Sequence, residues 1–159
     1  MKNIGLLFGS FNPLHNGHIM LAEAALQEAD LDEIWFVVQR RNDYKPAFDF
    51  IDYNTRLQLI VDSGYKVYEP HSTDYAHLVR DTLKELTDHH LTLLLGEDLA
   101  ASFASWDDYD EIARLATIYQ SHRIDDISSG LIRDRLAHNQ PIDDLVPPAV
   151  ANYLAQHQQ

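Results

Sequence analysis

The sequence predicts an α/β fold, in which a doubly wound, mostly parallel sheet of five strands carries helices on both faces. Short apolar runs of strand length alternate along the chain with longer segments in which apolar residues recur at helical spacing. The first apolar run also passes into a helical segment through a turn of small residues. Open α/β sheets bind phosphate groups at such turns, against the N-terminus of the following helix.

The five expected strands are runs rich in aliphatic and aromatic residues. They lie near residues 3–8, 33–38, 66–69, 91–95 and 116–120. The first run, Ile4-Gly5-Leu6-Leu7-Phe8, is apolar apart from its glycine, which is typical of a parallel strand buried on both faces. Right-handed crossovers between successive strands would leave a ligand crevice at their carboxyl ends.

The expected helices follow the strands one by one. They lie near residues 17–29, 53–63, 74–88, 107–115 and 128–138. In the first of them, apolar positions from Ile19 to Leu26 recur at helical spacing. A last helix opens at Pro147-Pro148 and runs to about residue 156, because proline is tolerated in the first turn of a helix.

Composition limits the class of protein. A chain of 159 residues with 45% hydrophobic content suits one domain spanning residues 1–159, and it contains no cysteine for a disulfide or a zinc thiolate. The net charge of -13 argues against a nucleic-acid partner, because a phosphate backbone needs a basic surface. The first apolar run is too short for a signal peptide and no run reaches the length of a membrane span, so we expect a cytoplasmic protein without a membrane partner.

Two histidines follow the first strand, in the segment Gly9-Ser10-Phe11-Asn12-Pro13-Leu14-His15-Asn16-Gly17-His18. Their spacing places both imidazoles within one turn of chain, where they can face an anion held by the exposed N–H groups of a helix start. The segment resembles the T/HxGH signature of the nucleotidyltransferase superfamily. That resemblance implies a Rossmann-like nucleotidyltransferase fold and transfer of a nucleotidyl group from a nucleoside triphosphate.

A second match lies far downstream, in Ile127-Ser128-Ser129-Gly130-Leu131-Ile132-Arg133. Two serines at a helix start offer hydroxyls and backbone donors, and an arginine one turn later offers a forked cation to a polyphosphate. The segment resembles the ISSxxIR motif of the same superfamily. Occurring in the expected order, the two motifs support each other.

Between the two motifs the chain resembles the nicotinate/nicotinamide mononucleotide adenylyltransferase family. The segment from Leu93 to Trp106 is similar to its GxDxLxxFxxW pattern, which implies that Gly96 and Asp98 lie beside a nucleotide ribose and that Trp106 packs on the pyridine ring. Lys45 stands where the family has a phosphate-contacting lysine, and Arg56 matches an arginine early in its next helix.

The chain departs from the family in two places. Residues 77–83 match the family's YTxxTL helix start only at their end, and the segment before Ile127 is shorter than usual. These departures concern the acceptor side of the site, so the sequence leaves open whether the acceptor is the acid or the amide mononucleotide. The oligomeric state is equally open.

The resemblance assigns each candidate residue a role. The catalytic residues would be His15, His18, Lys45 and Arg133. ATP would be bound by Gly9, Ser10, Phe11, His15, Gly17, His18, Gly96, Asp98, Ile127, Ser128, Ser129 and Arg133. The acceptor would be bound by Asn12, Lys45, Arg56 and Trp106. No third metal ligand stands at a fixed spacing from the histidines, so we expect no protein metal site and expect Mg²⁺ to arrive with ATP.

The expected reaction moves AMP from ATP to nicotinate or nicotinamide mononucleotide, releases pyrophosphate and serves NAD biosynthesis. Three alternatives remain. A phosphopantetheine adenylyltransferase shares both motifs and a helix start like Val146-Pro147-Pro148, although Trp106 and the residues after Gly96 do not match it. A cytidylyltransferase would use CTP instead of ATP. A regulatory protein that binds nucleotide without catalysis belongs to another class altogether.

Overall fold

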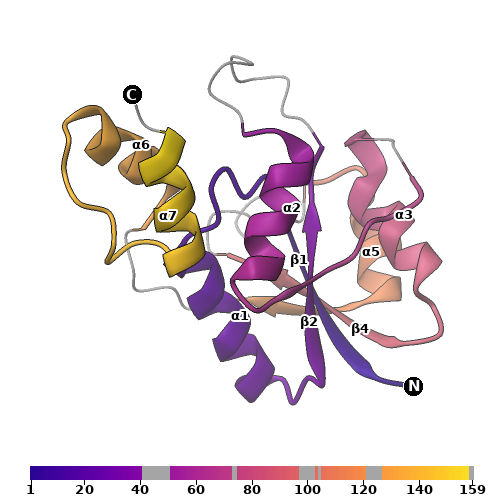
Figure 1. The fold of residues 1–159 in the computed structure, drawn as a ribbon. Coiled ribbons are helices and arrows are strands. Elements are labelled where there is room, and N and C mark those ends of the chain that lie inside the picture. The colour runs from indigo at the N-terminus through magenta and orange to yellow at the C-terminus, as the bar shows by residue number, and fades with distance from the viewer. Residues whose placement is uncertain (41–50, 73–74, 97–102, 104, 121–126, 158–159) are drawn as a thin grey trace.

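The protein is built around one sheet of five parallel strands with helices on both faces (Figure 1). The computed structural model describes residues 1–40, 51–72, 75–96, 103, 105–120 and 127–157. The strands are ordered β3-β2-β1-β4-β5 across the sheet. This arrangement confirms the doubly wound α/β fold that the sequence predicts.

The elements follow one another along the chain as alternating strands and helices. The strands are β1 (Asn3–Gly9), β2 (Glu33–Val38), β3 (Lys66–Val67), β4 (His90–Leu95) and β5 (Thr117–Gln120). The helices are α1 (Asn16–Glu28), α2 (Tyr53–Asp62), α3 (Leu78–Glu85), α5 (Tyr109–Leu115), α6 (Ser129–Ala137) and α7 (Pro148–His157), with a short 3₁₀ helix η2 (Tyr75–His77) before α3.

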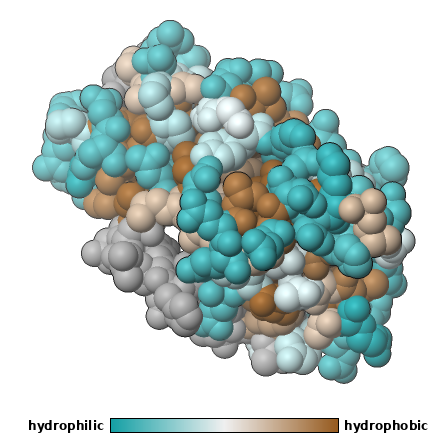
Figure 2. All heavy atoms as spheres, turned by 90° about the horizontal axis from the view of Figure 1, so that it is seen from below, coloured by the Kyte–Doolittle hydropathy of each residue, from teal (hydrophilic) through white to brown (hydrophobic). Residues whose placement is uncertain are grey.

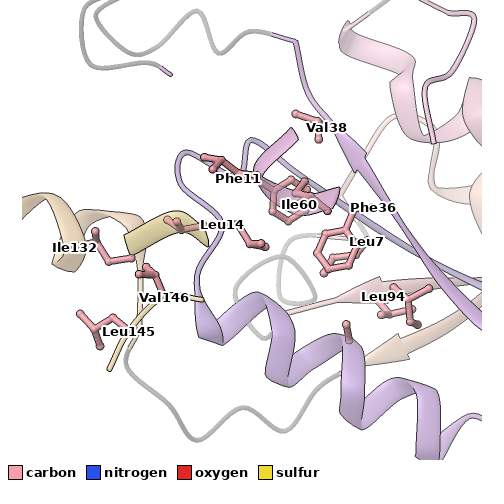
Figure 3. Close-up of a cluster of buried hydrophobic side chains, with 14 of the residues drawn as sticks. Leu7, Phe11, Leu14, Phe36, Val38, Ile60, Leu94, Ile132, Leu145 and Val146 are labelled. Carbon is pink, nitrogen blue, oxygen red and sulfur yellow. The ribbon is translucent and has the colours of Figure 1, made fainter. Parts of the chain in front are cut away.

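The sheet separates two hydrophobic clusters, and its strands supply alternate residues to each. In β1, Leu7 faces the cluster that α1, α2, α6 and α7 cover, whereas Leu6 and Phe8 face the cluster beneath α3 and α5. In β4, Leu94 faces the first side and Leu93 the second. Figure 1 shows these two groups of helices on opposite sides of the sheet, and Figure 3 shows the first cluster. The period of two residues in strands is therefore what buries both faces.

Two elements differ from the sequence prediction. The helix expected over residues 74–88 is a 3₁₀ turn followed by α3, which ends at Glu85. Leu86 is buried, so the apolar period continues past the point where helical hydrogen bonding stops. The strand expected over residues 66–69 is shorter in the structure, where β3 covers only two residues at the edge of the sheet. The last backbone bond to β2 is donated by the N–H of Tyr68 to Phe36 O, and Pro70, which has no N–H, follows two residues later.

No helix in the described part of the chain is both long and apolar enough to cross a membrane.

Glu33 joins three neighbouring strands at their amino ends. Its carboxylate accepts hydrogen bonds from Lys2 Nζ at 2.5 Å, from Lys66 Nζ and from Trp35 Nε1 at 3.3 Å. These partners, led by the hydrogen bond from Lys2, lower the pKa of Glu33 from 4.5 to about 2. Figure 2 views the molecule from this end of the sheet, where hydrophilic residues surround smaller hydrophobic areas.

The lowered pKa of Glu33 predicts a pH-dependent contribution to stability. A carboxylate with a lowered pKa in the folded protein stabilises it above the unfolded pKa and loses that effect as pH falls toward the folded value. We therefore expect Glu33→Gln to reduce the free energy of unfolding at pH 7, and the difference from the parent to vanish between about pH 4.5 and pH 2. Urea unfolding across that range measures it, and a difference independent of pH would contradict the assignment.

Candidate active site

The predicted ligand crevice lies between the carboxyl ends of β1 and β4, where the direction of strand order changes. From β1 the chain builds one side of the sheet through β2 and β3, and it then returns to the other side of β1 as β4 and β5. Ligands of open parallel sheets bind at such a point. The two nucleotidyltransferase motifs follow β1 and β5, so both reach this edge.

The turn between β1 and α1 is supported from below by Phe11. Its backbone is in the left-handed region at φ 48°, which costs a non-glycine residue about 1 to 2 kcal/mol, and its ring is only 2% exposed. The ring contacts His18 edge-on at 4.7 Å between centroids and packs on Phe36 at 5.2 Å. The side chain of Phe11 therefore supports the turn, and the ATP contact expected of this residue stays a prediction.

His15 and His18 cap the start of α1 reciprocally. His15 Nδ1 accepts from the backbone N–H of Gly17 at 3.1 Å, and His18 Nδ1 accepts from the backbone N–H of His15 at 3.1 Å. The two rings stack at 3.6 Å between centroids with 18° between their planes. Since both Nδ1 atoms accept, the hydrogen-bond pattern assigns the proton of each neutral ring to Nε2. Each imidazole is thus held as an Nε2–H donor at a helix N-terminus.

Arg56 holds together the segments behind this turn. Arg56 is only 1% exposed. Its guanidinium donates to four backbone carbonyls: from Nε to Ile51 O at 2.7 Å, from Nη1 to Ser10 O at 2.8 Å and Gln39 O at 2.6 Å, and from Nη2 to Arg40 O at 2.6 Å. Burial lowers the pKa of Arg56 from its ordinary value. The structure gives Arg56 this structural role, because its fork is directed at backbone carbonyls inside the protein, and the acceptor contact that the resemblance implies for Arg56 stays a prediction.

Asn12 links the same turn to both neighbouring segments. Asn12 is only 3% exposed, and its side-chain Oδ1 accepts a hydrogen bond from the backbone N–H of Ile51 at 2.8 Å. Its backbone carbonyl accepts from Arg133 Nη1 at 3.2 Å. The side chain of Asn12 therefore supports the turn from within, and its carbonyl brings Arg133 to the first motif. The acceptor contact expected of Asn12 stays a prediction.

The second motif forms the start of α6, as the sequence predicts. Ser128 is the N-cap, and its Oγ accepts from the backbone N–H of Leu131 at 3.0 Å. Ile127 packs partly buried against the first hydrophobic cluster, to which Ile132 and Leu14 also belong (Figure 3). Packing of Ile132 thus anchors α6 on the same core as the histidine turn, and Ser129 is the first residue of the helix.

The described residues include only part of the β4 side of the crevice. Gly96 follows β4, and apart from its neighbours in the chain no heavy atom of the described residues lies within 4 Å of the position that a Cβ would take there. Trp106 is partly buried, and its indole meets Phe103 edge-on at 5.2 Å with 87° between the planes. Lys45 and Asp98 lie outside the described residues.

One group of polar residues was missed by the sequence reasoning. His77, at the start of α3, lies 2.7 Å from Asp108 through Nδ1 and Oδ2, and Arg80 Nη1 lies 3.4 Å from Asp108 Oδ1. The sequence contained a signal for this group. Arg80 and Lys84 are four residues apart, on one face of α3, and acidic residues stand at the start of α5. Ion pairs between the two helices could not be inferred without knowing that α3 and α5 are adjacent.

Within the described residues, no three His, Asp or Glu side chains gather closely enough to hold a metal ion. The structure brings together His15, His18, Arg133 and the backbone of Gly9, Ser10 and Gly17. It places Trp106 and Gly96 on the β4 side.

A family model described as cytidylyltransferase-like matches residues 6–146, which include both motifs and all of the sheet except the first residues of β1. The chain belongs to this cytidylyltransferase-like family. A Flavobacterium johnsoniae protein named probable nicotinate-nucleotide adenylyltransferase is 30% identical over 95% of both chains. A Bacillus licheniformis protein of the same name is 26% identical over 99% of this chain and 97% of its own.

Solved structures of similarly named proteins share the fold of this family member. The crystal structure of a Vibrio parahaemolyticus protein, described as a putative nicotinate-nucleotide adenylyltransferase, has a TM-score of 0.74 and 22% identity over 98% of this chain and 99% of its own. The Plasmodium falciparum nicotinic acid mononucleotide adenylyltransferase complexed with NaAD has a TM-score of 0.72 and 19% identity over 99% of this chain and 96% of its own. Both comparisons confirm the nucleotidyltransferase fold that the sequence predicts.

The burial of Arg56 predicts a large effect of its removal on stability. Arg56→Met would leave buried carbonyl oxygens without donors, so we expect the free energy of unfolding to fall by about 3 kcal/mol. Arg56→Lys recovers less than half of that loss, because one ammonium group cannot reach all four carbonyls.

Urea unfolding of these variants measures the effect. The matched control is Arg135→Met, since Arg135 lies at the surface with its exposed partner Asp144, and we expect it to change the free energy of unfolding by less than about 0.5 kcal/mol. Equal effects at Arg56 and Arg135 would contradict the role assigned to Arg56.

Proposed function

We propose that this chain transfers the adenylyl group of ATP to nicotinate mononucleotide and releases pyrophosphate, a step of NAD biosynthesis. The names of its relatives support this reaction and favour the acid over the amide acceptor. The observation that carries the proposal is the contact between the two motifs, the histidine turn before α1 and the serine cap of α6. Arg133 Nη1 binds the carbonyl of Asn12, in the turn whose end carries the reciprocally capped histidines.

The reaction needs no covalent enzyme intermediate. An oxygen of the acceptor phosphate attacks the α-phosphorus of ATP, a new P–O bond forms there, and the bond to the β-phosphate oxygen breaks so that pyrophosphate leaves with the electron pair. Negative charge builds up on the α-phosphate oxygens and on the departing pyrophosphate. A protein accelerates such a step by positioning the reactants and stabilising that charge.

The two histidines suit the α-phosphate. In this proposal, Nε2–H of His18 contacts an α-phosphate oxygen in the transition state, with His15 beside it. The capping bonds hold both rings in place before ATP binds, so no ordering of these side chains is required during the reaction. The N–H groups at the start of α1 add partial positive charge at the same place.

Cations near the second motif suit the leaving group. The β- and γ-phosphates would be bound by Arg133, which contacts the first motif, by Ser128 and Ser129 in the first turn of α6, and by Lys45. Mg²⁺ would arrive with the ATP substrate and would neutralise part of the charge of its phosphates. On the acceptor side, Trp106 would pack on the pyridine ring. Gly96 and Asp98, which are expected among the ATP contacts, would lie beside a nucleotide ribose.

The proposal predicts that His18 can be replaced with loss of catalysis but little loss of stability. His18 is the third residue of α1, where a glutamine side chain can accept from the backbone N–H of the N-cap residue. His18→Gln should therefore preserve the free energy of unfolding while lowering kcat about a hundredfold with ATP and nicotinate mononucleotide.

Pyrophosphate release measures this effect, with His138→Gln as the matched control because His138 lies exposed at the end of α6. The same assay compares nicotinamide mononucleotide and phosphopantetheine as acceptors and CTP as donor. Turnover with a different donor and acceptor, but not with ATP and nicotinate mononucleotide, would show that the proposed substrates are wrong. Nucleotide binding without any turnover would favour a regulatory protein, and unchanged kcat in His18→Gln would remove His18 from the mechanism.

A further inference from the structure

A group of charged side chains borders the acceptor side of the crevice. Helix α3 leads into β4 and α5 follows it, so the N-termini of both helices lie at the edge of the sheet where β4 ends. Figure 1 shows the two helices packed on the same face of the sheet. Asp108 precedes α5 and bridges to His77 and Arg80 at the beginning of α3.

The carboxylate of Asp108 is engaged across the interface between the helices. Aspartate at an N-cap position commonly accepts from the backbone N–H groups of its own helix. Asp108 is the N-cap of α5 but makes no such side-chain bond. Its side chain, 14% exposed, instead binds His77 at 2.7 Å and Arg80 at 3.4 Å. The residue therefore fixes the start of α5 to the start of α3.

The other carboxylates of α3 hold the segment before η2. Asp81 accepts from Ser72 Oγ at 2.8 Å, and Glu85 accepts from the backbone N–H of His71 at 3.0 Å. Asp81 also pairs with Arg80 at 2.9 Å, so Arg80 lies between two carboxylates, Asp81 on its own helix and Asp108 before α5. Lys84 binds Glu111 at 2.9 Å, which ties α3 to α5 one turn farther from the crevice. Among the described residues, Asp108 and Glu111 thus each connect α3 to α5 through ion pairs, and the connection made by Asp108 adjoins the crevice.

Asp108 belongs to the turn that carries Trp106. The backbone N–H of Trp106 donates to Phe103 O at 3.1 Å, and the N–H of Tyr109 donates to Trp106 O at 3.1 Å. These two bonds tie Trp106 to Phe103 and to Tyr109, and the indole precedes the carboxylate of Asp108 by two residues. Movement of Asp108 away from α3 would therefore move Trp106.

We propose that Asp108 is a positioning residue for the acceptor, which acts by holding the Trp106 turn against His77 and Arg80. The part of this inference that concerns the pyridine mononucleotide rests on the proposed function. In this chain, residues 77–83 depart from the family's YTxxTL pattern and supply His77 and Arg80. We call the bonds of these two residues to Asp108 the tether of the Trp106 turn. The tether acts on acceptor binding and leaves ATP binding, on the β1 and α6 side, unchanged.

The first test observes Trp106 directly and needs no substrate. Trp35 is the other tryptophan of the chain, so the Trp35→Phe protein reports Trp106 alone. In that background we expect Asp108→Asn and His77→Gln to shift the emission of Trp106 to longer wavelength and to increase its quenching by acrylamide. Glu111→Gln, which removes the more distant connection, should change neither. Unchanged emission and quenching in Asp108→Asn would overturn the proposal.

The second test separates acceptor binding from the other steps. For Asp108→Asn we expect the KM for nicotinate mononucleotide to rise about tenfold, with the KM for ATP and kcat within about twofold of the parent. Glu111→Gln should leave all three unchanged. Equal rises in both KM values, or the same rise in Glu111→Gln, would show only a loss of helix packing and would overturn the positioning role. Lack of pyrophosphate release by the parent would contradict the proposed function and the acceptor role with it, while the fluorescence result still decides whether Asp108 positions Trp106.

Discussion

The buried guanidinium of Arg56 is the interaction on which the geometry of the crevice depends. It donates to the carbonyl of Ser10 in the turn after β1 and to carbonyls of Gln39, Arg40 and Ile51 in the connection between β2 and α2. Backbone carbonyls inside a protein need donors, and a single planar fork supplies several of them at once. The turn is therefore held at a fixed distance from the sheet before any ligand binds.

The turn between β1 and α1 determines the positions of Arg133 and of the two histidines. Asn12 presents its carbonyl to Arg133, which joins α6 to β1 across most of the length of the chain. At the end of the same turn, His15 and His18 satisfy backbone donors at the start of α1, so the groups that cap the helix are also the groups proposed to meet the α-phosphate. Because both tasks use different ring nitrogens, Nδ1 for the cap and Nε2 for the ligand, they do not compete.

Much of the fold could be predicted from the sequence because its information is local. The apolar runs of β1 and β4, the small-residue turn and the serine cap of α6 each depend on a few neighbouring residues. The roles of Phe11, Asn12 and Arg56 could not be predicted in this way. A motif shows that these residues accompany a phosphate-binding turn, but only the packing shows that their side chains support it from inside. The bridge from Asp108 to His77 depends likewise on two helices that are neighbours in space and are separated by β4 in the chain.

The central claim is that this crevice transfers an adenylyl group, and the fate of the α-phosphate tests it most directly. The purified protein would be incubated with nicotinate mononucleotide and MgATP labelled either in the α-phosphate or in the γ-phosphate. The account predicts that the α-label appears in a dinucleotide product and the γ-label in pyrophosphate, in equal amounts. Transfer of the γ-label to the acceptor, or release of inorganic phosphate without a dinucleotide, would contradict it.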